Sequence, residues 1–81
     1  MRNAQIILNH IAKSIRRRIE DAGYASVDQF CKENKIVKST VYRAIKNERS
    51  PRFVTLIEIA DALGISLQDL LDLEKINLRR K

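Results

Sequence analysis

The segment at residues 36–51, IVKSTVYRAIKNERSP, constrains the fold more than any other part of the chain. At the helical period of about 3.6 residues, it divides into an apolar arc and a polar arc. The apolar arc, which needs a protein core to pack against, consists of Val37, Val41, Ala44 and Ile45. The polar arc consists of Lys38, Ser39, Tyr42, Arg43 and Lys46. Ammonium, hydroxyl, phenol and guanidinium groups hydrogen-bond to base edges and phosphates. The segment therefore predicts a helix that packs by one side and presents the other to a nucleic acid.

The distribution of charge supports this interpretation more strongly than the net charge of +6. Residues 35–52 contain six Lys or Arg and one acid, whereas residues 53–74 contain five acids and no Lys or Arg. Such segregation predicts a positive face directed at a polyanion and a negative face elsewhere. The alternative is a solvated surface on which charges cluster by chance. We disfavour it because the positive block coincides with the amphipathic segment.

At 81 residues the chain is long enough for one small domain with a single core. Its one cysteine, Cys31, excludes an internal disulfide and leaves no cysteine partner for a metal cluster. We expect it to be a small core residue rather than a redox switch. No run reaches the roughly 18 apolar residues of a membrane span, and no signal peptide is visible. We expect a soluble, cytoplasmic protein.

The sequence offers little for catalysis. It has no glycine-rich phosphate loop, no histidine beside a candidate nucleophile and no pair of acids in an apolar setting. The single histidine, His10, has no second ligand at metal-binding spacing. We expect no enzyme activity, no metal, no cofactor and no small-molecule ligand.

Local signals predict the first two helices. Apolar residues recur at helical spacing over residues 3–22, and Gly23 suits the position just past a helix end. Ser26 is a predicted N-cap, and Gln29, three residues later, completes a capping box. The second helix is expected to end at about Asn34. The residues that it is expected to bury are Phe30 and Cys31.

Three more helices follow. A turn at Lys35 leads into the third helix, which Asn47 can end because asparagine tolerates the left-handed conformation. The fourth helix stops at Gly64, and its apolar stripe is Phe53, Leu56, Ile57, Ala60 and Leu63. Ser66 with Asp69 caps the fifth helix. Its apolar residues are Leu67, Leu70 and Leu71, continued by Leu73 and Ile76. No stretch alternates with a period of two, so we predict an all-α, compact bundle of about five short helices.

Residues 26–51 resemble the helix-turn-helix of the Cro and lambdoid phage repressor class, also called the xenobiotic-response-element type. The similarity continues through PRFVTLIEIADALGISLQDLL, residues 51–71, which resembles the fourth and fifth helices of these repressors. The resemblance implies one lambda-repressor-like domain over residues 1–81 that binds DNA. The helix-turn-helix would lie at about residues 26–47, and a short basic tail at residues 78–81.

The resemblance also implies which side chains contact DNA. The positions that family members use for bases are occupied by Lys38, Ser39 and Arg43, and those near the phosphate backbone by Lys46, Arg49 and Arg52. Thr40 and Tyr42 flank these positions; we assign Thr40 to the backbone and Tyr42 to the bases, with packing at the core edge as the alternative for Tyr42. Ser26, at a helix N-terminus, is placed to contact a phosphate unless it serves only as a cap. Independently of the resemblance, the guanidinium of Arg43 can donate a fork of two hydrogen bonds to guanine.

The sequence departs from the family pattern at three positions. Val27 stands where the second helix often begins with a glutamine that clamps a phosphate and braces the third helix. Val37 replaces the usual serine cap of the third helix, a loss of about 1 kcal/mol if nothing compensates. Lys35 replaces the turn glycine and would be mildly strained at a positive φ.

Together these features predict a sequence-specific, double-stranded DNA-binding transcriptional regulator, a repressor associated with the nucleoid. One helix-turn-helix reads only a few base pairs, so we expect a homodimer on a palindromic operator. The expected dimer contact, unless these residues close the core instead, is Leu67, Leu71, Leu73 and Ile76. A restriction-modification controller fits as a subclass. The rival interpretations are a protein-interaction module on the same fold, such as an antitoxin or a repressor antagonist, and a polyanion or RNA binder that acts by charge alone.

Overall fold

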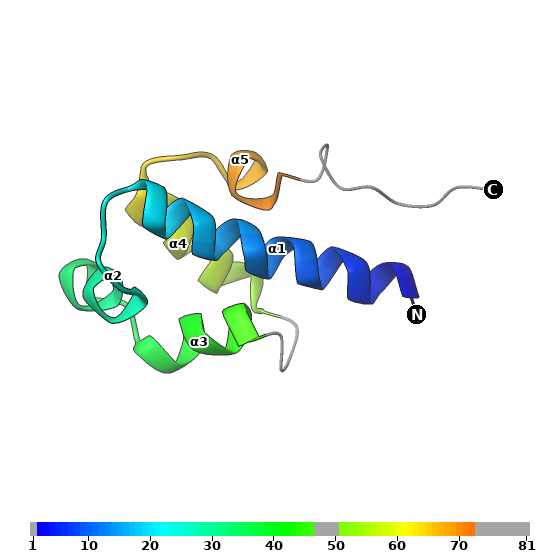
Figure 1. Ribbon diagram of the computed structural model, residues 1–81, viewed down its shortest axis with the longest axis horizontal. Helices are drawn as coiled ribbons and strands as arrows, with labels where there is room; N and C mark the ends of the chain where they lie inside the picture. The colour runs from blue at the N-terminus through cyan, green and yellow to red at the C-terminus, as the bar shows by residue number, and fades with distance from the viewer. Residues whose placement is uncertain (1, 47–50, 73–81) are drawn as a thin grey trace.

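The computed structural model describes residues 2–46 and 51–72, and these contain five α-helices and no strand. The helices are α1 (Arg2–Asp21), α2 (Val27–Asn34), α3 (Lys38–Lys46), α4 (Phe53–Leu63) and α5 (Leu67–Leu71). Helix α1 crosses the molecule, with α5 on one side and α2 and α3 on the other (Figure 1). The predicted all-α bundle is confirmed.

Helix α1 is the centre of the packing and contacts each of the other four helices. Its residues Ile11, Ile15 and Ile19 are spaced four apart, lie on one face and are buried. They belong to one core cluster with buried residues from α2 to α5, which are Phe30, Cys31, Val41, Ala44, Ile45, Leu56, Ile59, Ala60 and Leu70. Each large apolar side chain buried in this way contributes about 1.5–3 kcal/mol.

The predicted caps at Ser26 and Ser66 and the predicted helix end at Gly64 are confirmed by hydrogen bonds and dihedral angles. The Ser26 hydroxyl accepts from the Gln29 backbone N–H at 3.1 Å, and the Gln29 side chain accepts from the Ala25 N–H at 2.6 Å. The capping box therefore reaches one residue further back than the usual pattern. Ser66 caps α5 in the same way, since it accepts from the Asp69 N–H at 3.0 Å. Gly64 ends α4 with a φ of 73°.

Two predictions about buried faces are wrong. The sequence pattern places Val37 on the apolar arc of the third helix, but it lies before α3 and is 66% exposed. The pattern also places Phe53 and Ile57 on the buried stripe of the fourth helix, but they are 63% and 44% exposed. Helix α4 is apolar on more than one side, so its sequence allows more than one orientation. Packing against α1 and α5 selects a rotated face, which is Thr55, Leu56, Ile59 and Ala60.

Side chains of α1 bind the backbone at the end of α5. The Ser14 hydroxyl donates to the Leu70 carbonyl at 2.5 Å, and an Arg18 N–H donates to the Asp69 carbonyl at 3.0 Å. Nε2 of His10 lies 2.7 Å from the Asp72 carbonyl oxygen, to which it therefore donates. These bonds satisfy carbonyl groups that have no partner within so short a helix. They fix α5 against the side of α1 that faces away from α3 (Figure 1).

The apolar residues of the fifth helix divide into two groups. Leu70 is buried, and Leu67 and Leu71 are half-buried and packed against the core. Asp72, in the left-handed conformation at a φ of 52°, follows the helix. The predicted continuation through Leu73 and Ile76 lies outside the described residues, as does the predicted helix end at Asn47.

Candidate nucleic-acid interface

Helix α3 is held by one side and exposed on the other, as its sequence predicts. Val41, Ala44 and Ile45 are buried in the core cluster. The opposite side exposes Lys38, Ser39, Arg43 and Lys46, with Tyr42 half-buried beside them. The guanidinium and the two ammonium groups are therefore available to a large polyanion without any rearrangement of the core.

A tight turn joins α2 to α3. Lys35 adopts the left-handed conformation at a φ of 57°, and its own N–H and that of Ile36 bond back to carbonyls of α2. The positive φ that would strain a lysine in the place of the turn glycine is therefore present at Lys35. Beneath the turn, Cys31 is buried, and burial is the main cause that raises the pKa of its thiol. A protonated, enclosed thiol is a poor nucleophile, which fits its expected role as a small core residue.

The start of α3 has a substitute for the missing serine cap. The Thr40 hydroxyl donates to the Val37 carbonyl at 2.7 Å, and the Thr40 N–H donates to the same oxygen at 3.2 Å. Thr40 is half-buried, and its one hydroxyl hydrogen is used in this bond. It cannot also donate to a phosphate in this conformation, so a backbone contact by Thr40 stays a prediction that needs a different rotamer.

A carboxylate from α2 braces the exposed side of α3. The Tyr42 hydroxyl lies 2.7 Å from Oδ1 of Asp28, and Nζ of Lys38 lies 3.8 Å from Oδ2 of the same residue. The hydrogen bond to Asp28 is the main cause that raises the pKa of the Tyr42 phenol. Nζ of Lys46 lies 5.6 Å from the centre of the Tyr42 ring, within the range of a cation–π contact.

Sequence reasoning missed Asp28. The sequence shows that Val27 cannot supply the glutamine clamp of the family pattern. The residue after it, Asp28, supplies a brace of another kind. The contact joins residues 14 positions apart across two helices, so no local spacing rule indicates it. The one available signal is weak: Asp28 is an acid in the first turn of a helix beside a basic segment.

The remaining candidate residues are distributed as follows. Within the part of the chain that is described, Ser39 and Arg43 make no hydrogen bond or ion pair. Ser26 is exposed; its oxygen serves as a helix cap, and its hydroxyl hydrogen is still available to a phosphate. Arg52 is exposed at the residue before α4. Arg49 lies outside the described residues.

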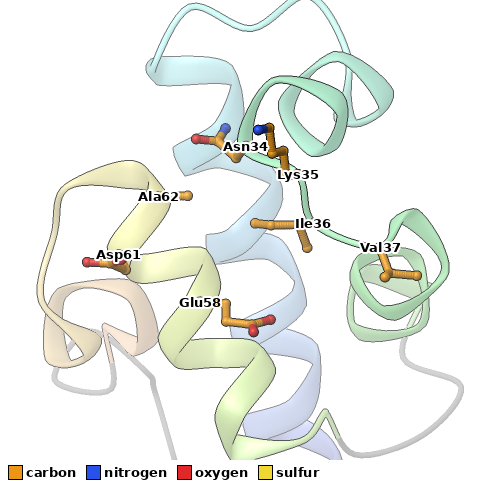
Figure 2. A pocket seen from close by; sticks show the side chains of 7 residues that line it. All are labelled: Asn34, Lys35, Ile36, Val37, Glu58, Asp61 and Ala62. Atoms are coloured by element: carbon orange, nitrogen blue, oxygen red, sulfur yellow. The ribbon is translucent and has the colours of Figure 1, made fainter.

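A groove of about 350 Å³ lies between α4 and the segment that joins α2 to α3. In Figure 2 the two walls face each other; they are formed by Asn34, Lys35, Ile36 and Val37 and by Glu58, Asp61 and Ala62. Its lining residues include two acids, Glu58 and Asp61, and one lysine, Lys35, so the groove is unsuited to phosphate. The same helix α4 also exposes Phe53, Val54 and Ile57.

Other kinds of site find no support in residues 2–46 and 51–72. No three His, Cys, Asp or Glu residues there are grouped so that they could hold a metal ion. None of the helices described there is both long and apolar enough to cross a membrane.

Comparison with known proteins gives one match. Residues 14–75 match a family described as the Cro/C1-type HTH DNA-binding domain. The match includes α2 to α5 and the part of α1 from Ser14 to Asp21, and therefore all of the brace between α2 and α3. No curated protein and no solved structure matches the chain.

Proposed function

Because the chain belongs to the Cro/C1-type HTH DNA-binding domain family, we propose that it is a sequence-specific transcriptional regulator, a repressor that binds a palindromic operator as a homodimer. Such a protein acts by occupancy, because a dimer bound over a promoter excludes polymerase. Its place is on the nucleoid, in the cytoplasm.

The observation that carries the proposal is the exposed side of α3. Arg43 is exposed there and has no partner within the described residues, so its fork is available to the O6 and N7 acceptors of guanine. Lys38 is 60% exposed and can donate to the same kind of acceptor. Lys46 and Arg52 are suited to phosphates, which they would bind without regard to sequence.

We infer a dimer because one recognition helix contacts only a few base pairs. Two copies on half-sites about one helical turn apart would double that number. Of the proposed contact residues, Leu67 and Leu71 are half-buried and pack partly against their own core, which leaves part of each side chain for a partner, whereas Leu73 and Ile76 lie outside the described residues. The exposed residues Phe53, Val54 and Ile57 of α4 offer a second apolar face.

One observation favours a second function, that of a protein-interaction module. Helix α4 combines the apolar residues Phe53, Val54 and Ile57 with the carboxylates Glu58 and Asp61, and apolar patches of this kind serve protein contacts. In this interpretation α4 binds a different protein, and DNA binding is secondary.

Selection of duplexes from a random pool tests the proposal. A regulator yields a consensus, and a two-fold symmetric consensus indicates a dimer. Arg43→Ala should reduce the preference for the consensus duplex over a scrambled duplex, without weakening binding to the scrambled duplex. Lys46→Ala should weaken both equally. A pool that returns no consensus contradicts the proposal and leaves the charge-only binder. The variant Phe53→Ser distinguishes the two apolar faces, because it disrupts a dimer only if α4 forms the contact.

A further inference from the structure

We propose that Asp28 is a positioning residue that determines the base preference of Tyr42. By accepting the hydroxyl hydrogen of Tyr42, it leaves the phenol oxygen able only to accept a hydrogen bond, which directs it to the exocyclic amine of adenine or cytosine. This inference rests on the proposed function, since it assumes that the exposed side of α3 reads bases.

The direction of the hydrogen bond follows from the two groups. A carboxylate can only accept, so at 2.7 Å the Tyr42 hydroxyl must donate to Oδ1 of Asp28. The raised pKa of the phenol agrees with this, because a hydrogen bond to a carboxylate stabilises the protonated hydroxyl. The remaining lone pair of the phenol oxygen can then receive a donor from outside the protein.

The exposed side of α3 carries two rows of side chains, one held by contacts and one without them within the described residues. Lys38, Tyr42 and Lys46 follow one another at four-residue spacing, and all three are connected through Asp28 or through the Tyr42 ring. Ser39 and Arg43 form the neighbouring row and have no partner within the described residues. The first row presents Tyr42 in a fixed orientation, whereas the second can adjust to the duplex.

The donors and acceptors of the major groove determine which bases Tyr42 can contact in this orientation. Phosphate oxygens, guanine O6 and N7, and thymine O4 are all acceptors, and a phenol that has no hydrogen to offer cannot bond to them. The donors in this groove are adenine N6 and cytosine N4. The Asp28 carboxylate is 58% exposed on its side chain and also repels nearby phosphates. Asp28 therefore acts against binding to sequences that lack a suitably placed amine.

A double-mutant cycle with Asp28→Ala and Tyr42→Phe tests the inference. Each protein is titrated with its consensus duplex and with a duplex in which one base pair is reversed, and the ratio of the two affinities is measured at each position. One neutral hydrogen bond contributes about 1 kcal/mol, so the wild type should show roughly a fivefold preference at the position of Tyr42. Each single variant should reduce it to less than about twofold, and the double variant should reduce it no further.

The ratio is insensitive to partial unfolding, because the unfolded fraction affects both duplexes equally. Asp61→Ala, which removes an exposed acid of α4, is the matched charge control and should keep the wild-type ratios. Asp28→Ala alone should also bind scrambled duplex about two- to fivefold more tightly, through the lost repulsion of phosphate. Unchanged ratios in Asp28→Ala, or effects of the two variants at different base pairs, overturn the inference. If the wild type itself has no consensus, the proposed function fails instead.

Discussion

Helices α3 and α4 follow one another in the chain and contact each other and α1, yet their exposed sides are opposite in character. Helix α3 carries four polar or cationic residues outward and contains no acid. Helix α4 exposes Phe53, Val54 and Ile57 with two carboxylates, and contains no Lys or Arg. Their buried sides, by contrast, are similar small sets of aliphatic residues in the same core. The buried sides fix the bundle, and the exposed sides decide what each helix can bind.

The largest expected effects test the similarity of the two buried sides. Ile45→Ala in α3 and Ile59→Ala in α4 should each lower the free energy of unfolding by about 2–5 kcal/mol, because each leaves a cavity in the core. Urea unfolding followed by circular dichroism measures both. A loss below about 0.5 kcal/mol in one variant alone would mean that the two helices do not share one core.

The next effect tests the difference between the exposed sides. Arg43→Ala should weaken binding to the selected duplex by about 1–3 kcal/mol, which is roughly 5–150-fold, because it removes a bidentate contact. Glu58→Ala on α4 is the control and should change the affinity by less than about twofold, since its exposed charge lies on the acidic helix. Fluorescence anisotropy of a labelled duplex measures both. Equal losses in the two variants would show that α3 is not the reading helix.

A smaller effect separates phosphate contacts from base contacts on α3 itself. Lys46→Ala should reduce the slope of log affinity against log salt concentration by about 0.9, the value for one phosphate contact on B-DNA. The change should be the same on the selected and the scrambled duplex, because phosphates carry no sequence information. A change in the preference between the duplexes, with an unchanged slope, would instead indicate that Lys46 contacts a base.

The comparison of α3 with α4 also shows what could be predicted from the sequence. The caps at Ser26 and Ser66 and the ends at Lys35 and Gly64 depend on neighbouring residues, and sequence analysis predicted all four. The division of α3 was predictable because its apolar and polar residues alternate cleanly with the helical period. The error at Val37 was one of boundary, since the helix begins one residue later.

The features that could not be predicted depend on contacts between distant residues. Helix α4 has apolar residues around most of its circumference, so only the packing of α1 and α5 decides that Ile59 is buried and Ile57 exposed. The brace between Asp28 and Tyr42 depends on how α2 crosses α3, which no local pattern encodes. The same holds for His10 and the Asp72 carbonyl, 62 positions apart.

The smallest expected effect concerns the C-terminal ends of α2 and α4. Both α2 and α4 end in a left-handed residue, a lysine with a φ of 57° and a glycine with a φ of 73°. A side chain in this conformation costs about 1–2 kcal/mol, whereas glycine costs about 0.5–1 kcal/mol in entropy.

Lys35→Gly should therefore raise the free energy of unfolding by about 1 kcal/mol or less, and Gly64→Ala should lower it by a similar amount. Since a Cβ at Gly64 would meet no atom within 4 Å, that loss reports the backbone alone. If urea unfolding shows instead that Lys35→Gly is destabilising, the left-handed backbone does not dominate the free energy of this turn, and the two helix ends are not equivalent.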